Sequence, residues 1–131
     1  MIEREEICFK NEVYDKEEKV VHYKRPWMAG KSIFYKNRIY VSKGVDKISR
    51  VKYILHPTFP NPVRTVTNKD KNFELIFWAW GGFQMEIIVT DTDGEIYNYG
   101  FSTRLNELLR EAKADKSVKW NNESLADQID I

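Results

Sequence analysis

Hydrophobic and polar residues alternate along most of the middle of the chain. Val51, Tyr53 and Leu55 are the apolar positions of one extended segment, and the same alternation runs through residues 83–89. An apolar residue at every second position is typical of a β-strand with one buried face. Similar short segments predict further strands at residues 7–9, 20–23, 63–67, 73–80 and 96–101. Residues 33–41 fit either one strand or a hairpin around Lys36 and Asn37.

Turn signals separate these segments. Pro57, Pro60 and Pro62 follow one strand closely, and prolines cannot donate to a β-ladder, so residues 57–62 are expected to form a stiff loop. Asp93 and Gly94 form a dipeptide that favours a β-hairpin between residues 83–90 and 96–101.

A helical pattern appears only after the strands. Apolar residues recur at positions 105, 108, 109 and 112, which lie on one face of a helix, and Thr103 stands where it can cap that helix. A series of short strands followed by one helix predicts an all-β, immunoglobulin-like antiparallel β-sandwich with one C-terminal helix. We expect residues 1–30 to be an extension that adds a strand or strands, residues 31–114 to be the sandwich domain, and residues 115–131 to be a tail.

Composition and charge narrow the possible partners. The chain has 131 residues, with 21 basic and 20 acidic side chains and a formal net charge of +1. This balance supplies no global field for nucleic acid or for an anionic membrane, so neither is an expected partner. The longest apolar run, residues 75–83, is too short to cross a bilayer. A single cysteine, Cys8, and a charged N-terminus without a signal-peptide pattern favour a cytoplasmic location.

Common catalytic and metal-binding patterns are missing from the sequence. Two histidines and one cysteine cannot supply the usual four-ligand zinc site, and there is no Walker loop and no GxSxG motif. The acidic residues at 91, 93 and 95 resemble the start of a calcium loop, but a strand pattern follows them, so a hairpin is preferred. Cys8 is interpreted as a small buried hydrophobe rather than a nucleophile. We therefore predict no enzymatic activity, no cofactor and no metal.

Two loop motifs carry a resemblance to a known family. The first motif consists of Leu55, His56, Thr58, Phe59, Pro62 and Arg64, and the second consists of Trp80, Gly81 and Phe83 followed by an apolar strand. In their order and spacing they resemble the YEATS domain family, and in particular its prokaryotic branch. Two positions depart from the common pattern: Gly82 replaces a frequent acidic residue, and Pro57 a frequent polar one.

The resemblance implies an immunoglobulin-like sandwich that binds acylated lysine between loops at one end. Phe59 and Trp80 would be two aromatic walls around the acyl-amide, and the Thr58 hydroxyl and the Trp80 backbone N–H would hydrogen-bond it. His56 would line and brace the pocket, and Gly81 and Gly82 would keep its far end open. The implied binding residues are therefore His56, Thr58, Phe59, Trp80, Gly81 and Gly82. A planar neutral amide between aromatic faces, with one donor and one acceptor, is a physically reasonable complex.

Other side chains near these motifs have weaker functional interpretations. A further aromatic wall could come from Trp27 or Phe34. Trp78 is interpreted as sheet packing or a pocket rim, and Arg64 as a residue that holds its loop or forms a structural ion pair. His56 is as readily explained by loop bracing as by ligand contact, and Thr58 could instead make a local turn bond.

The preferred hypothesis is a recognition module for acetyl- or crotonyl-type lysine, with an aromatic sandwich pocket. Its partner would be an acylated lysine on a protein or peptide, in a prokaryotic signalling, stress or defence system that could include an effector protein. The alternative is an immunoglobulin-like protein–protein adaptor that uses a sheet face or a loop surface and has no acyl pocket.

Overall fold

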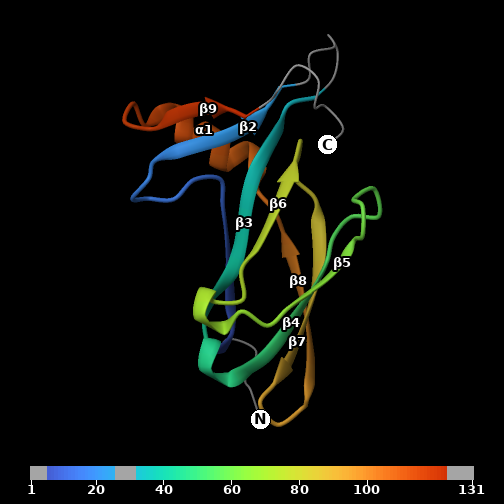
Figure 1. Cartoon of the computed structure of the whole chain (residues 1–131). Helices are drawn as coiled ribbons and strands as arrows, with labels where there is room; N and C mark the ends of the chain where they lie inside the picture. Colours follow the sequence, from blue (N-terminus) through green and yellow to red (C-terminus); the bar gives the residue numbers. More distant parts are fainter. Residues whose placement is uncertain (1–5, 26–31, 124–131) are drawn as a thin grey trace. The chain divides into compact units, whose positions relative to one another are not determined.

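The computed structural model describes residues 6–25 and 32–123, and β-strands dominate this part of the chain (Figure 1). The strands are β1 (Cys8–Glu12), β2 (Val20–Lys24), β3 (Phe34–Lys43), β4 (Ile48–Ile54), β5 (Val63–Val66), β6 (Leu75–Ala79), β7 (Gln84–Asp91), β8 (Ile96–Ser102) and β9 (Lys119–Asn122). The α-helix of the described residues, α1, covers Leu105–Ala114, and short 3-10 turns cover Val45–Lys47 and Lys69–Lys71. No helix in these described ranges has both the length and the apolar character needed to cross a bilayer.

The strands form two sheets. One sheet has the order β5-β4-β7-β8, and all three of its ladders are antiparallel. The other has the order β1-β3-β2-β9, and β6 also pairs with β3. The fold is therefore the predicted all-β sandwich with a helix near its C-terminal end. One ladder differs from the antiparallel expectation, because β9 runs parallel to β2.

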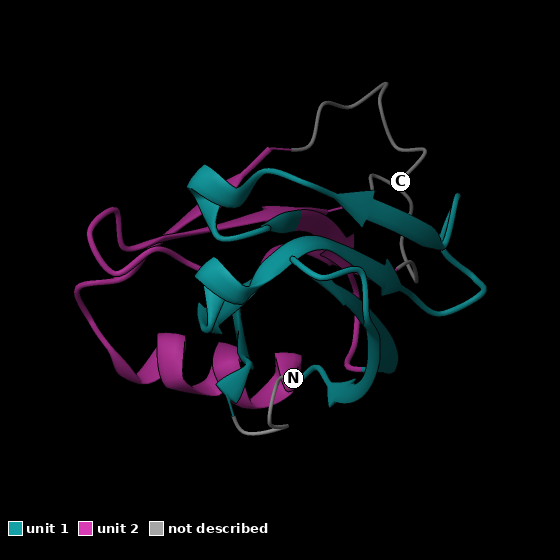
Figure 2. Ribbon diagram, turned by 90° about the horizontal axis from the view of Figure 1, so that it is seen from below, with its two compact units in different colours: residues 1–11, 39–75, 83–103 teal, residues 12–38, 76–82, 104–131 magenta. Residues whose placement is uncertain are grey.

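By its contacts the chain divides into two compact units, which are coloured separately in Figure 2. Unit 1 consists of residues 1–11, 39–75 and 83–103, and unit 2 consists of residues 12–38, 76–82 and 104–131. The long strand β3 contributes its first half to unit 2 and its second half to unit 1. Of the residues 33–41, all but Ile33 lie in the single strand β3, so the one-strand alternative is confirmed and the hairpin alternative around Lys36 and Asn37 is wrong.

Unit 1 has a core built from both sheets. The alternating residues Val51, Tyr53, Ile87 and Val89 are fully buried, as their spacing predicts. Phe9 on β1 meets Tyr53 edge-on, with 6.5 Å between the ring centroids, and the Tyr53 hydroxyl donates to the Phe73 carbonyl oxygen at 2.8 Å. Burying such rings removes a large apolar area from water, and the hydroxyl remains satisfied.

A tight hairpin in unit 1 joins β7 to β8. Gly94 adopts φ +88°, a conformation that glycine accepts without strain. The Asp91 carboxylate accepts the N–H groups of Asp93 and Glu95, both at 2.9 Å. Burial by itself raises the pKa of Asp91, but these two N–H groups and the Tyr97 hydroxyl outweigh burial, so the pKa lies below its usual value. The predicted hairpin is confirmed.

Unit 2 combines β2, the first half of β3, β9 and α1. Leu105, Leu109 and Ala112 are the buried residues of α1, which confirms that the apolar stripe faces inward. His22 on β2 lies between two carboxylates, with Nε2 2.6 Å from Glu18 Oε1 and Nδ1 3.0 Å from Glu123 Oε2. The Glu123 contact joins β2 to the chain that follows β9, and the Glu18 contact joins β2 to the turn that precedes it.

Two local predictions are wrong. The N-cap of α1 is Arg104 and makes no side-chain capping bond, because the Thr103 hydroxyl is used by the backbone of Phe83 instead. Cys8 is exposed on β1 rather than buried. For Thr103, a partner 20 residues away decides the role of the hydroxyl.

Candidate functional site

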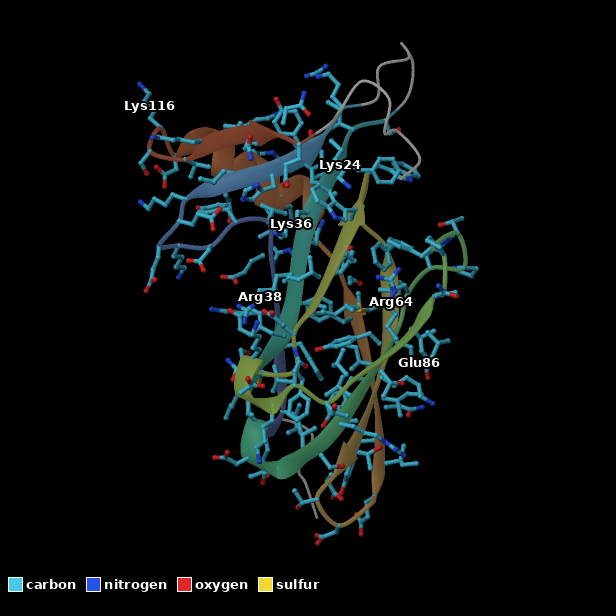
Figure 3. The ribbon with its side chains drawn as sticks, viewed as in Figure 1. Lys24, Lys36, Arg38, Arg64, Glu86 and Lys116 are labelled. Atoms are coloured by element: carbon cyan, nitrogen blue, oxygen red, sulfur yellow. The ribbon has the colours of Figure 1, made fainter. Side chains whose placement is uncertain are left out.

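The loop between β4 and β5 is held closed by its own hydrogen bonds. The Leu55 N–H donates to the Pro62 carbonyl at 2.8 Å, which joins the two ends of the loop. Arg64, labelled in Figure 3, donates from Nε to the Asn61 carbonyl at 3.2 Å and from Nη2 to the Pro60 carbonyl at 3.0 Å. Arg64 therefore holds its loop, which is one of the two roles that the sequence predicted for it.

Inside this loop, His56 and Thr58 are hydrogen-bonded to each other, and the donor and acceptor of each bond can be assigned. The Thr58 backbone N–H donates to His56 Nδ1 at 3.2 Å, so Nδ1 must carry a lone pair. The Thr58 hydroxyl lies 2.8 Å from the same nitrogen and must then be the donor of that contact. As a result, the lone pairs of the Thr58 oxygen remain available to accept a hydrogen bond from a ligand.

Phe59 is supported by a second aromatic residue. The Phe59 N–H donates to the His56 carbonyl at 3.0 Å, which shapes the turn, and the Phe59 and Phe83 rings lie 5.0 Å apart at an interplanar angle of 50°. Phe83 is itself anchored, because its N–H donates to Thr103 Oγ1 at 2.8 Å and its carbonyl accepts the Thr103 N–H at 2.9 Å. Phe59 is half-buried, so one part of its ring is packed and the rest faces solvent.

An open depression of about 530 Å³ lies beside this loop within unit 1. The chain from Ile54 at the end of β4 to Pro57 lines one part of it, and residues of β7 and β8 line the remainder. Its polar side chains include Glu86, which is labelled in Figure 3 and accepts a hydrogen bond from Asn98 at 3.3 Å. The depression could therefore receive an extended polar chain next to His56.

The turn from Trp80 to Gly82, which precedes Phe83 of the second motif, lies in unit 2 and is much more open than the His56 loop. Trp80 is 64% exposed, which is unusual for so large an apolar side chain. A Cβ atom added at Gly81 would meet no atom of the described residues within 4 Å, so the space beside this glycine is empty of protein there. Trp78, two residues earlier, is half-buried under Lys24, whose Nζ lies 4.4 Å from the indole centroid. That contact agrees with a packing or rim role for Trp78.

The predicted site residues thus divide into two sets. His56, Thr58 and Phe59 occupy one hydrogen-bonded loop in unit 1, whereas Trp80, Gly81 and Gly82 occupy the exposed turn in unit 2. The pairing of Phe59 with Trp80 as two walls of one pocket remains a prediction. Trp27 lies outside the described residues, and Phe34 is a half-buried residue at the start of β3.

Sequence reasoning gave no structural role to Phe83 beyond its place in the motif. The structure shows that the Phe83 ring packs against Phe59. The sequence did point to this residue, because Phe83 belongs to the second motif and directly follows the glycine pair. For metal binding, no group of three or more His, Cys, Asp or Glu side chains gathers within residues 6–25 and 32–123. The pairs at His22 and at Asp91 are explained by hydrogen bonding within the protein.

Together, these observations define a β-sandwich module that carries aromatic and hydrogen-bonding side chains on its loops. A family model described as the prokaryotic YEATS domain matches residues 35–102, and this range contains both motifs. The chain belongs to this family. The resemblance seen in the two motifs and the fold class are both confirmed.

Comparison with individual proteins agrees with this assignment. Fifty residues are 46% identical to transcription initiation factor TFIID subunit 14 of Schizosaccharomyces pombe, and this match spans 37% of the chain but only a fifth (20%) of the yeast protein. The Yaf9 YEATS domain recognising an H3K122suc peptide superimposes with a TM-score of 0.51 at 21% identity, covering 78% of this chain and 72% of that one. The Yaf9 YEATS domain bound to H3K27ac gives 0.52 at 23% identity, with coverages of 75% and 68%. Yaf9 is a yeast protein.

Proposed function

We propose that this domain recognises an acylated lysine, of acetyl or crotonyl type, on a protein or peptide. The observation that carries the proposal is the His56–Thr58 pair, which leaves the Thr58 oxygen able to accept a hydrogen bond, on the residue directly before Phe59. A secondary amide carries one N–H donor and one carbonyl acceptor, and the Thr58 oxygen complements the N–H. Family membership and the two Yaf9 complexes with modified H3 peptides support the same ligand class.

Acylation changes lysine in a way that this site could read. It removes the positive charge and creates a planar amide, which stacks on aromatic faces far better than a hydrated ammonium group. Phe59 and the exposed Trp80 would provide those faces, and the Trp80 N–H would donate to the acyl carbonyl. Gly81 and Gly82 would allow the backbone to approach the end of the acyl chain without a side-chain clash.

The module would act by binding rather than by catalysis. His56 Nδ1 is already occupied by Thr58, and both ring nitrogens of His22 lie against the carboxylates of Glu18 and Glu123. A signalling or effector protein would then be recruited through the acylated partner, in the cytoplasm of a prokaryotic cell. The depression beside His56 is suited to the residues that flank the modified lysine.

The test is a calorimetric titration of the whole chain with four peptides that differ only at one lysine: unmodified, acetylated, propionylated and crotonylated. We expect at least tenfold tighter binding of one acylated peptide than of the unmodified one, which is about 1.4 kcal/mol. Equal affinity for all four peptides at millimolar concentration would refute the proposal. The adaptor alternative would then be the better explanation of the fold.

A further inference from the structure

A second hollow, of about 570 Å³, lies entirely within unit 2. Its walls come from the start of β3, from the turn after β6 and from one face of α1, which is labelled in Figure 1. The side chains that matter are Ser32, Tyr35, Trp80, Asn106, Arg110 and Lys113. All of these residues belong to unit 2, whereas the hydrogen-bonded loop of His56 and Thr58 belongs to unit 1.

The charged side chains that line this hollow are all positive. Arg110 and Lys113 lie one helical turn apart on α1, and both are exposed. Neither forms an ion pair in the part of the chain that the structure describes, and no described Asp or Glu lines the hollow. On the same helix, Glu107 accepts the Arg104 Nε–H at 2.7 Å, and this bond, with a smaller contribution from Arg110, lowers the pKa of Glu107. The negative charge of Glu107 is therefore matched chiefly by Arg104.

The remaining lining complements a carboxylate on a short apolar stem. Ser32 and Asn106 carry hydrogen-bond donors, and burial raises the pKa of Tyr35, so its hydroxyl stays protonated and can donate. Trp80 contributes an exposed indole, and Leu109 contributes apolar surface from the helix. Two cations, several neutral donors and one large aromatic face are thus brought together.

We propose that this hollow binds an acidic residue of a partner peptide, with the carboxylate at Arg110 and Lys113 and a neighbouring apolar residue on Trp80. Charge complementarity selects this occupant, since the hollow offers two positive side chains and no described negative one. A nucleic acid fits less well, because phosphate backbones are bound by longer basic tracks and the net charge of the chain is only +1. The proposal does not require acyl-lysine binding, and it would make an acidic neighbour part of the recognised sequence.

The experiment uses two short unacylated peptides that contain Glu-Leu-Glu or Gln-Leu-Gln in the same neutral frame. Each is titrated into the whole, isotope-labelled chain while the indole N–H of Trp80 and the amides of Arg110 and Lys113 are followed by NMR. We expect about tenfold tighter binding of the Glu peptide, lost in the Arg110→Gln/Lys113→Gln variant and weakened by salt. The matched control is Lys52→Gln/Lys71→Gln, which removes the same charge from exposed positions outside the hollow.

A charge-reversal variant tests the binding site by a gain of affinity, which a loss of folding could not produce. The Lys113→Glu variant should bind a Lys-Leu-Lys peptide better than the parent does. Equal affinity of the parent for the Glu and Gln peptides, or equal loss in the control variant, would overturn the proposal. Stronger binding of a single-stranded oligonucleotide at the same NMR signals would overturn it in favour of nucleic acid. Adding a crotonyl-lysine to the Glu peptide tests the acyl pocket separately, because its failure would leave the Glu–Gln difference intact.

Discussion

The two motif segments are built in opposite ways. The loop from His56 to Pro62 is closed by hydrogen bonds from Leu55, Arg64 and Thr58, and its phenylalanine leans on Phe83. The turn from Trp80 to Gly82 has a largely exposed indole and a glycine with empty space beside it. The His56 loop is therefore ordered before any ligand binds, whereas the Trp80 turn exposes its aromatic side chain to solvent.

This difference separates stability from binding in a way that mutations can measure. Side chains of the His56 loop should contribute to both, because they are partly packed and bonded. Trp80 should contribute to binding and hardly to stability, because exposed side chains add little to the free energy of unfolding. Pre-ordering the hydrogen-bonding half of a site lowers the entropy that is lost when a ligand binds.

The largest effect is expected for Phe59→Ala. It removes a half-buried ring from Phe83, so the free energy of unfolding should fall by about 2–3 kcal/mol, less than for a fully buried phenylalanine. Acyl-lysine affinity should fall as well. Urea unfolding together with calorimetric titration measures the two changes, and Phe59→Tyr serves as the control that keeps the ring. Unchanged stability in Phe59→Ala would show that the Phe83 contact contributes nothing.

A somewhat smaller effect, larger on binding than on stability, is expected for Thr58→Val, which also removes the hydrogen bond from the Thr58 hydroxyl to His56 Nδ1. The shape of the side chain is kept, but the acceptor oxygen is lost, so acyl-lysine affinity should fall by about 1–3 kcal/mol. Thr58→Ser should restore most of it, because the hydroxyl can still donate to His56 Nδ1. Titration of the same crotonylated peptide into all three proteins decides the matter. Full affinity in the valine variant would mean that Thr58 makes only its local turn bond.

For Trp80→Ala we expect at least a tenfold loss of acyl-lysine affinity, about 1.4 kcal/mol, with an unchanged melting temperature. The indole is 64% exposed, so its removal leaves no internal cavity. Thermal melts and ligand titrations on one preparation distinguish the outcomes, and Trp80→Phe is the conservative partner. A loss of about 3–5 kcal/mol in stability would identify Trp80 as a core residue and would remove the contrast between the two segments.

The smallest effect should come from Asp91→Asn, at the hairpin between β7 and β8, which belongs to neither segment. The folded-state pKa of Asp91 is lowered, so its contribution to stability is present above the unfolded pKa, about 3.9, and is lost as pH falls through the folded value. The variant should therefore flatten the acid limb of a stability-against-pH curve measured by urea unfolding. Peptide affinity at neutral pH should stay the same. A parallel loss of affinity would show that the hairpin and the loops are coupled.

Local patterns in the sequence carried much of this description. Alternation identified the buried faces of β4 and β7, the Leu105–Ala112 stripe identified the buried face of α1, and Asp93–Gly94 identified a hairpin. The two motifs identified the family. These features can be read directly because backbone geometry imposes a period of two on a strand and about 3.6 on a helix, whatever lies opposite.

Tertiary structure decided which side chains meet across long stretches of chain. The parallel pairing of β9 with β2, the use of the Thr103 hydroxyl by Phe83 and the exposure of Cys8 could not be read from periodicity. The same holds for the hollow in which Arg110 and Lys113 join Trp80. A period shows which face of an element is buried but not which element lies against it. Each of these features depends on a partner at least 20 residues away or on the solvent around a strand, so only the folded chain determines it.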